Sequence, residues 1–261
     1  MKAAHTLSII AAAFGASVVV TGAYITSSEV VARLAQSSAE PNQIAHRALG
    51  AALVLVAIGL AIASRSLPTR ALAWTGTALL AALAASGWPG APLSPVLGVF
   101  HALLSHLYFA IAIATAVVTS KHWSRPAELA DVRKPFLRPL ALGTPPVVLT
   151  QITLGALYRH NVIGIILHIA VAMAVALLAL ILCSVVLQNY TRPPELKRAA
   201  GTLMGAVLVQ VSLGIASLVM LLLNFTATNY FVAATVAHVL IGASTLAASA
   251  VMAMEVWRSA A

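Results

Sequence analysis

The chain has 261 residues, of which 61% are hydrophobic and only 8% are charged. Apolar runs of about 18 residues or more recur along its whole length, which is the pattern of a polytopic membrane protein and leaves no stretch for a soluble domain. The formal net charge of +9 does not indicate a nucleic-acid partner, because the basic residues gather between apolar segments, where they act as topology signals.

Eight segments are predicted to be transmembrane helices, since each crossing of a hydrocarbon core of about 30 Å needs roughly 20 residues. In chain order they cover residues 4–26, 42–64, 70–88, 93–119, 138–158, 161–188, 198–223 and 229–255. The first is expected to be a retained helix, because the apolar run after Lys2 is longer than the signal-peptide core of about 7 to 15 residues.

Lys and Arg residues mark one side of the membrane. They lie at the N-terminus, after the second, fourth and sixth segments, and at the C-terminus. These residues are Lys2, Arg65, Arg70, Lys121, Arg125, Arg133, Lys134, Arg138, Arg192, Lys197, Arg198 and Arg258. The positive-inside rule makes this side cytoplasmic and puts both termini inside. We therefore predict an all-α integral membrane protein of the cell inner (cytoplasmic) membrane. Of the three outer arginines, Arg33 is expected to pair with Glu29, four residues before it.

An internal repeat relates the first four segments to the last four. Thr21-Gly22-Ala23-Tyr24 near the end of the first segment recurs approximately as Leu154 to Tyr158 near the end of the fifth. Each half has an even number of helices, so an axis along the membrane normal would relate the halves. The prediction is two pseudo-symmetric four-helix bundles, residues 1–120 and 138–261, joined by a cytoplasmic linker at residues 121–137.

Four histidines, His46, His101, His168 and His238, lie in the outer parts of the even-numbered segments. Imidazole inside a bilayer needs a polar partner. A serine or a carbonyl could satisfy one such residue, but four at equivalent places in two halves favour a cofactor. Heme offers two axial positions, and facing helices of a bundle can supply them. The repeat pairs His46 with His101 and His168 with His238.

Other polar residues qualify this interpretation. Zinc is disfavoured because no carboxylate or thiolate accompanies the histidines, and the lone Cys183 is expected to fill space in the core. The outer residues Arg47 and Arg159 would place guanidinium groups at the mouths of the sites, where they suit heme propionates; snorkelling to lipid headgroups is the alternative.

The remaining histidines have lesser predicted roles. His106 follows His101 by five residues, about 140° round the helix, so the two cannot serve one iron and His106 is expected to pack or hydrogen-bond nearby. His5 and His122 are expected to face solvent on the inner side. His160 is a candidate for contact with a propionate.

Several segments together resemble the heme A synthase family, over essentially the whole chain. They are Ala45-His46-Arg47, His101 to Ala110, Gln151 to His160 with His168 following, and Gln210 to Gly214 with Ala237-His238. The chain is similar to a divergent bacterial-type member.

The resemblance implies an oxidoreductase that converts heme O to heme A by oxidising a ring methyl to a formyl group for cytochrome oxidase assembly. It implies that His168 and His238 are axial ligands of a heme b cofactor, and that His46 and His101 flank the iron of the substrate heme O. Besides the lipid bilayer, the implied partners are heme O synthase and cytochrome oxidase subunit I. A homo-oligomer is left open.

The chain departs from the family at a position implied to be catalytic. The family has Glu-x-x-His-Arg around its first histidine, whereas Gln43 stands at the glutamate position here. Glutamine cannot act as a base, and Glu40 could substitute only if the loop folds back. The cysteine pair that many bacterial members carry in the first outer loop is also absent. The alternative function is therefore a non-catalytic membrane heme-binding or assembly protein of the same fold.

Two further classes fit less well. A transmembrane electron carrier of the cytochrome b561 type needs hemes near both faces, whereas all four ligands are predicted in the outer half. A transporter would favour broken helices near the midplane, and Pro145-Pro146 is the only obvious break in the sequence.

Overall fold

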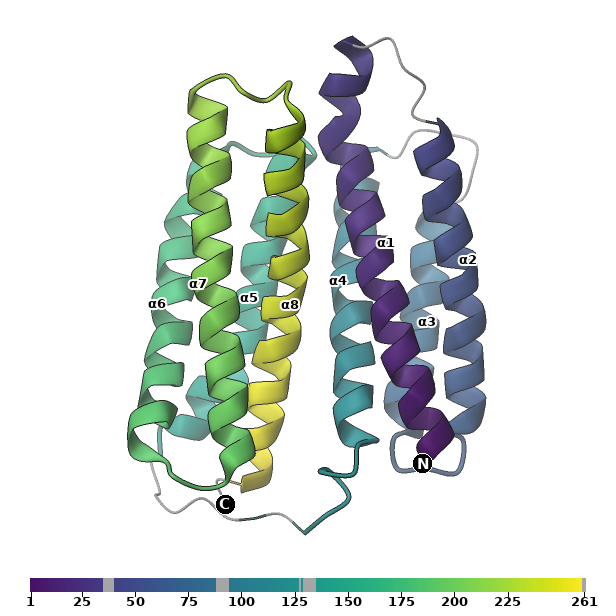
Figure 1. The fold of residues 1–261 in the computed structure, drawn as a ribbon, viewed down its shortest axis with the longest axis vertical. Coiled ribbons are helices and arrows are strands. Elements are labelled where there is room, and N and C mark those ends of the chain that lie inside the picture. The colour runs from purple at the N-terminus through teal and green to yellow at the C-terminus, as the bar shows by residue number, and fades with distance from the viewer. Residues whose placement is uncertain (35–39, 88–93, 127, 129–134, 260–261) are drawn as a thin grey trace.

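The computed structural model describes residues 1–34, 40–87, 94–126, 128 and 135–259, without the side chains of residues 30–34 and 40. These residues form eight helices and no strand (Figure 1). The helices are α1 (Lys2–Leu34), α2 (Glu40–Ala63), α3 (Arg70–Ser86), α4 (Pro95–Val118), α5 (Leu137–Arg159), α6 (Ile165–Asn189), α7 (Pro194–Leu222) and α8 (Asn229–Ser259). The predicted Glu29–Arg33 pair and the Glu40 carboxylate involve side chains outside this description.

Seven helices are long and apolar enough to cross a membrane, which supports the predicted multi-pass membrane protein. The exception is α3, whose 17 residues span about 26 Å at about 1.5 Å per residue. Helix α5 continues through Pro145 and Pro146, so these prolines do not break it.

The ends of α5, α6 and α7 follow local backbone chemistry. Asn161 has a positive φ of 57° and directs the chain out of α5, and α6 begins only after Gly164, later than the predicted start at residue 161. Pro194 stands in the first turn of α7, where its missing N–H costs nothing, so this helix begins earlier than the predicted residue 198.

The helices form two groups of four that lie side by side (Figure 1). Within the first group α1 contacts α2 and α4, and α3 contacts α2 and α4; within the second, α5 and α7 each contact both α6 and α8. The groups meet where α8 packs on α1 and α4, and where α4 contacts α5. The core of the first group is rich in alanine, which lets helices in a membrane approach closely.

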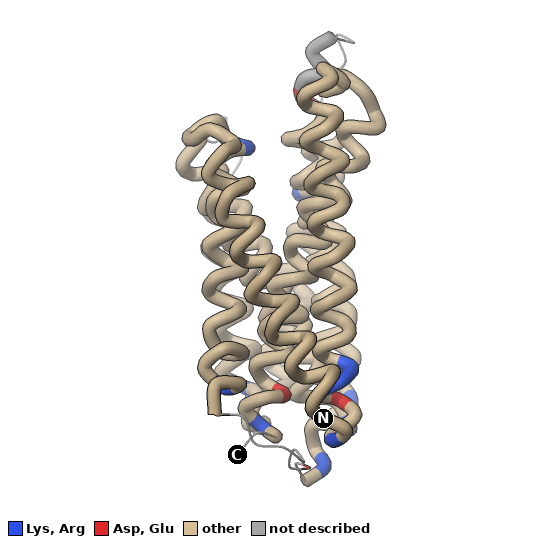
Figure 2. Tube along the Cα trace, turned by 90° about the vertical axis from the view of Figure 1, so that its left-hand side faces the viewer, with Lys and Arg blue, Asp and Glu red and all other residues tan. Residues whose placement is uncertain are grey.

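Both termini lie at the same end of the molecule, where most Lys and Arg residues gather (Figure 2). The connections after α2, α4 and α6 reach this end. The opposite end holds the starts of α2, α4, α6 and α8, and therefore the turns in which the four paired histidines lie.

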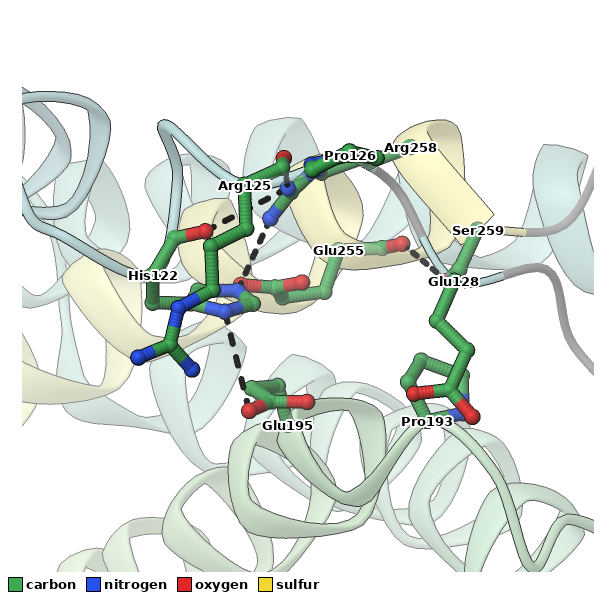
Figure 3. A pocket seen from close by; sticks show the side chains of 9 residues that line it. All are labelled: His122, Arg125, Pro126, Glu128, Pro193, Glu195, Glu255, Arg258 and Ser259. Carbon is green, nitrogen blue, oxygen red and sulfur yellow. Dashed lines mark hydrogen bonds and ion pairs between the residues drawn. The ribbon is translucent and has the colours of Figure 1, made fainter.

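His122 and His5 differ from the expectation that they face solvent. His122 Nε2 lies 3.0 Å from Glu255 Oε1 and 2.9 Å from Arg258 Nη1, while its Nδ1 lies 3.6 Å from Glu195 (Figure 3). His5 Nδ1 lies 3.1 Å from the Ala116 carbonyl. Both rings are half-buried. Their partners lie at the ends of other helices, and hydropathy alone does not predict that these ends meet. The His122 contacts attach the connection after α4 to α7 and α8.

Candidate functional site

Each of the four paired histidines rests on a glycine of the preceding helix. A Cβ placed on that glycine would lie unusually close to the ring Cε1, so a side chain there would displace the imidazole. The pairs and these distances are Gly22 and His46, 3.2 Å; Gly87 and His101, 2.8 Å; Gly155 and His168, 3.0 Å; and Gly214 and His238, 3.1 Å. The sequence predicts the four histidines but not the glycines that contact them. The recurrence of Gly22 and Gly155 in the internal repeat is the sequence feature that could have indicated these contacts.

The histidines come together in the two pairs that the repeat predicts. The ring centres of His46 and His101 are 6.1 Å apart, and those of His168 and His238 are 6.3 Å apart. An iron between two imidazoles requires a similar separation of about 6 Å, from metal–nitrogen bonds of about 2 Å and about 1.2 Å from each nitrogen to its ring centre. The ring centres of each pair are therefore about as far apart as those of two axial imidazoles on one metal ion.

Hydrogen bonds in the first pair fix which ring nitrogen carries the proton. His46 Nδ1 lies 2.8 Å from the Thr21 hydroxyl oxygen, and that hydroxyl donates to a carbonyl of its own helix at 2.9 Å. His101 Nδ1 lies 3.0 Å from the Ser86 hydroxyl oxygen, which likewise donates to its own helix at 2.8 Å. With its own hydrogen donated to the helix, each hydroxyl oxygen is placed to accept an Nδ1–H. Both Nε2 atoms keep a lone pair, as metal ligation requires.

Glutamines take the place of these hydroxyls in the second pair. His238 Nδ1 donates to the Gln210 backbone carbonyl at 3.2 Å, and the Gln210 amide nitrogen lies 3.2 Å from His238 Nε2. The Gln151 amide nitrogen lies 2.9 Å from both Nδ1 and the carbonyl oxygen of His168. Within the described residues, Oε1 of each glutamine is buried without a hydrogen-bond partner.

The orphaned Gln151 oxygen fits a metal-ligating His168. Ligation through Nε2 places the proton on Nδ1, which then needs an acceptor. The Gln151 amide would have to turn its oxygen to this N–H and give up the hydrogen bond that its nitrogen donates to the His168 carbonyl. The second pair therefore fits heme iron only if both glutamine amides move, because the Gln210 amide nitrogen also lies 3.2 Å from His238 Nε2, whereas the first pair fits it without such a change.

The two predicted propionate-binding arginines have different environments. Arg159 is half-buried between the halves, where its Nη2 donates to the Ala23 carbonyl at 3.2 Å and the Ser27 hydroxyl at 3.0 Å, both on α1. Arg47 and Gln43 are exposed in the outer part of α2. Of these two arginines, only Arg159 links the two halves, and Gln43 stands one helical turn outward of His46 on the same face.

The other chemistry-bearing side chains lie outside the pairs. His106 is buried and its Nδ1 donates to the Ala102 carbonyl of its own helix at 2.7 Å. Cys183 is buried in the apolar core of the second half. In the part of the chain that the structure describes, no three His, Cys, Asp or Glu side chains converge in a way that could hold a metal ion. Two imidazoles per site suit an ion whose remaining ligands come from a macrocycle.

No protein-family model matches the chain, and no curated protein matches it significantly.

Proposed function

We propose that the chain is a membrane heme protein of the heme A synthase type, with a heme b cofactor between His168 and His238 and a substrate heme O between His46 and His101. The protein would lie in the cell inner membrane with both termini in the cytoplasm. It would cross the membrane eight times, because α2 and α4 begin at the same end and α3 must return the chain between them. A helix slightly shorter than the bilayer is accommodated by local thinning.

The single observation that carries this proposal is the paired ring separation of 6.1 and 6.3 Å. Four imidazoles that each contact a glycine and have a hydrogen-bonding partner at Nδ1 would suit axial ligands, whereas packing alone would not need the same arrangement four times. Heme bound at such a site supplies an iron that cycles between two redox states. The protein's own contribution is to fix ring orientation and to exclude water from the iron.

The hydrogen bonds around the pairs support unequal roles. Gln151 and Gln210 enclose the second pair with buried amides, and the second half supplies all of these groups itself. The first pair is held by hydroxyls, and the turn of α2 just outward of it carries exposed side chains. Direct contacts with buried amides suit a resident cofactor, and a pair held by hydroxyls alone suits a substrate that enters and leaves.

Heme analysis of the full-length protein tests the proposal. The chain would be co-expressed with a heme O synthase, purified, and its extracted hemes separated by chromatography. Heme A, or the hydroxymethyl intermediate, together with a low-spin heme b spectrum would support the proposed function. A purified protein that holds no heme would contradict it.

A second candidate, a heme-binding assembly protein without methyl oxidation, is favoured by one observation. Gln43 lies three residues before His46 and offers no carboxylate at the position where the resemblance implies one. Such a protein would keep both histidine pairs and deliver heme to cytochrome oxidase subunit I. In the same experiment it would yield bound heme O and no heme A.

A further inference from the structure

His160 ends α5 at a sharp turn. Its backbone N–H donates to the Ala156 carbonyl at 3.0 Å, the next residue Asn161 has a φ of 57°, and the Val162 N–H returns to the Leu157 carbonyl at 2.9 Å. This left-handed ending satisfies the last carbonyls of the helix. It also fixes the backbone of a residue that belongs to neither histidine pair.

The His160 ring reaches across to the first half of the molecule. A Cβ on Gly98 of α4 would lie 2.5 Å from His160 Cε1, 2.6 Å from Nδ1 and 3.1 Å from Nε2. Gly98 is buried and precedes His101 by three residues, so it lies about one turn further outward on a neighbouring face of α4. His160 and His101 are close enough to interact electrostatically. The second half thus supplies a ring at the outer edge of the first pair.

The surroundings of His160 favour a neutral imidazole. Burial lowers the pKa of His160 below its ordinary value, and the Arg159 guanidinium lowers it further. The Glu29 carboxylate on α1 opposes this shift and also interacts electrostatically with Arg159. A neutral ring still has one N–H to donate, and here it stands beside a guanidinium. That combination attracts a carboxylate.

We propose that His160 is a ligand-binding residue of the first site, donating its ring N–H to a carboxylate of the porphyrin held between His46 and His101, with Arg159 adding positive charge. The inference rests on the proposed heme function and deepens it. A heme carries two propionates, and this edge of the site provides the His160 N–H donor near His101, with the Arg159 cation beside His160. The first site is then complete only when both halves are present.

Two probes that differ only in their carboxyl groups test this contact. Full-length protein purified from heme-deficient cells would be titrated in detergent with ferric protoporphyrin IX and with its dimethyl ester, which cannot act as an anion. Binding at the first site is the absorbance phase that a His46→Ala variant loses. His160→Phe keeps an aromatic ring on Gly98 but removes the N–H.

We expect His160→Phe to weaken free-acid binding at the first site about tenfold and to leave ester binding unchanged. Glu29→Gln removes a competing anion and should strengthen binding of the free acid only. Gly98→Ala should displace the ring and reproduce the His160→Phe loss, whereas Gly201→Ala, which meets no atom within 4 Å, serves as the matched control.

The outcomes separate the two proposals. Equal weakening of both probes in His160→Phe would overturn the carboxylate contact and leave the ring a steric role, and unchanged binding of both would remove His160 from the site. Either result leaves the proposed function standing. Failure of the unaltered protein to bind either probe would instead overturn the proposed function, and this inference with it.

Discussion

Gly87 and His101 make the closest of the four glycine–imidazole contacts, with 2.8 Å between the position of an added Cβ and the ring Cε1. Gly87 also closes α3, where its N–H lies 3.2 Å from the Leu83 carbonyl. The neighbouring Ser86 accepts the Nδ1–H of the same ring. Two consecutive residues therefore support and orient one proposed iron ligand.

Gly87→Ala should lower heme occupancy of the first site and spare the second. The added methyl must displace the ring from its position opposite His46, because real Cβ atoms do not approach this closely. The measurement is heme per protein from a pyridine hemochrome assay, expected to fall from two towards one after heme loading. Gly143→Ala, which meets no atom within 4 Å, is the control. Full occupancy in Gly87→Ala would argue against ligation by His101.

His168→Ala and His238→Ala should each remove the low-spin heme b spectrum. Loss of either imidazole leaves one axial position without its ligand, which weakens heme binding and changes the spin state of any heme retained. His5→Ala is the control, since this histidine bonds the Ala116 carbonyl at the opposite end of the helices from both pairs. The visible spectrum of each purified variant decides the matter, and an unchanged spectrum in both ligand variants would refute the assignment.

Thr21→Val should weaken heme binding at the first site without changing the size of the side chain. The valine cannot accept the Nδ1–H of His46, so the ring loses the contact that fixes its tautomer. Loss of such an outer hydrogen bond typically costs about 10- to 100-fold in metal affinity. Thr21→Ser keeps the hydroxyl and should bind as the unaltered protein does in the same titration. Equal affinities for Thr21→Val and Thr21→Ser would show that the hydrogen bond does not matter.

Substitution of Gln151 should shift the midpoint potential of the heme at the second site. A carboxylate in Gln151→Glu would accept the Nδ1–H of His168 more strongly, make the imidazole a better donor and stabilise ferric iron. Gln151→Leu removes the acceptor and should have the opposite effect. Redox titration should therefore give the lowest midpoint potential for Gln151→Glu, an intermediate one for the unaltered protein and the highest for Gln151→Leu. Any other order would show that the amide does not bond the ligand.

The helices and the histidine pairs could be predicted because both follow from the order of apolar segments. Hydropathy locates the spans, and alternation of direction places His46, His101, His168 and His238 in the same half of the bilayer. Contacts between the halves could not be predicted in this way. The reach of Arg159 to α1 and of His160 to Gly98 depends on how two bundles pack, which no local pattern in the sequence records.

Some local features were missed for a different reason. Gln151 and Gln210 are visible as polar residues in apolar helices, each four residues before a glycine that seats a histidine. The spacing from the glycine indicates a hydrogen bond only once the histidine on the facing helix is known. His122 was assigned to solvent because it lies in a charged connection, and its carboxylate partners come from the ends of α7 and α8.

Gln43→Glu separates the two candidate functions at the residue where they differ. Gln43 lies one helical turn outward of His46, so a carboxylate there would stand beside a heme held by the first pair and could accept a proton, which an amide cannot. If the chain is an assembly protein that lacks only this base, Gln43→Glu should convert co-expressed heme O to heme A or its hydroxymethyl intermediate, while the unaltered chain converts none.

If the unaltered chain already makes heme A, the enzyme operates without a base at this position, and Gln43→Leu should retain its activity. Chromatography of extracted hemes measures both results, with Gln43→Glu/His101→Ala as the control, since any conversion that persists without the ligand does not occur at the first site.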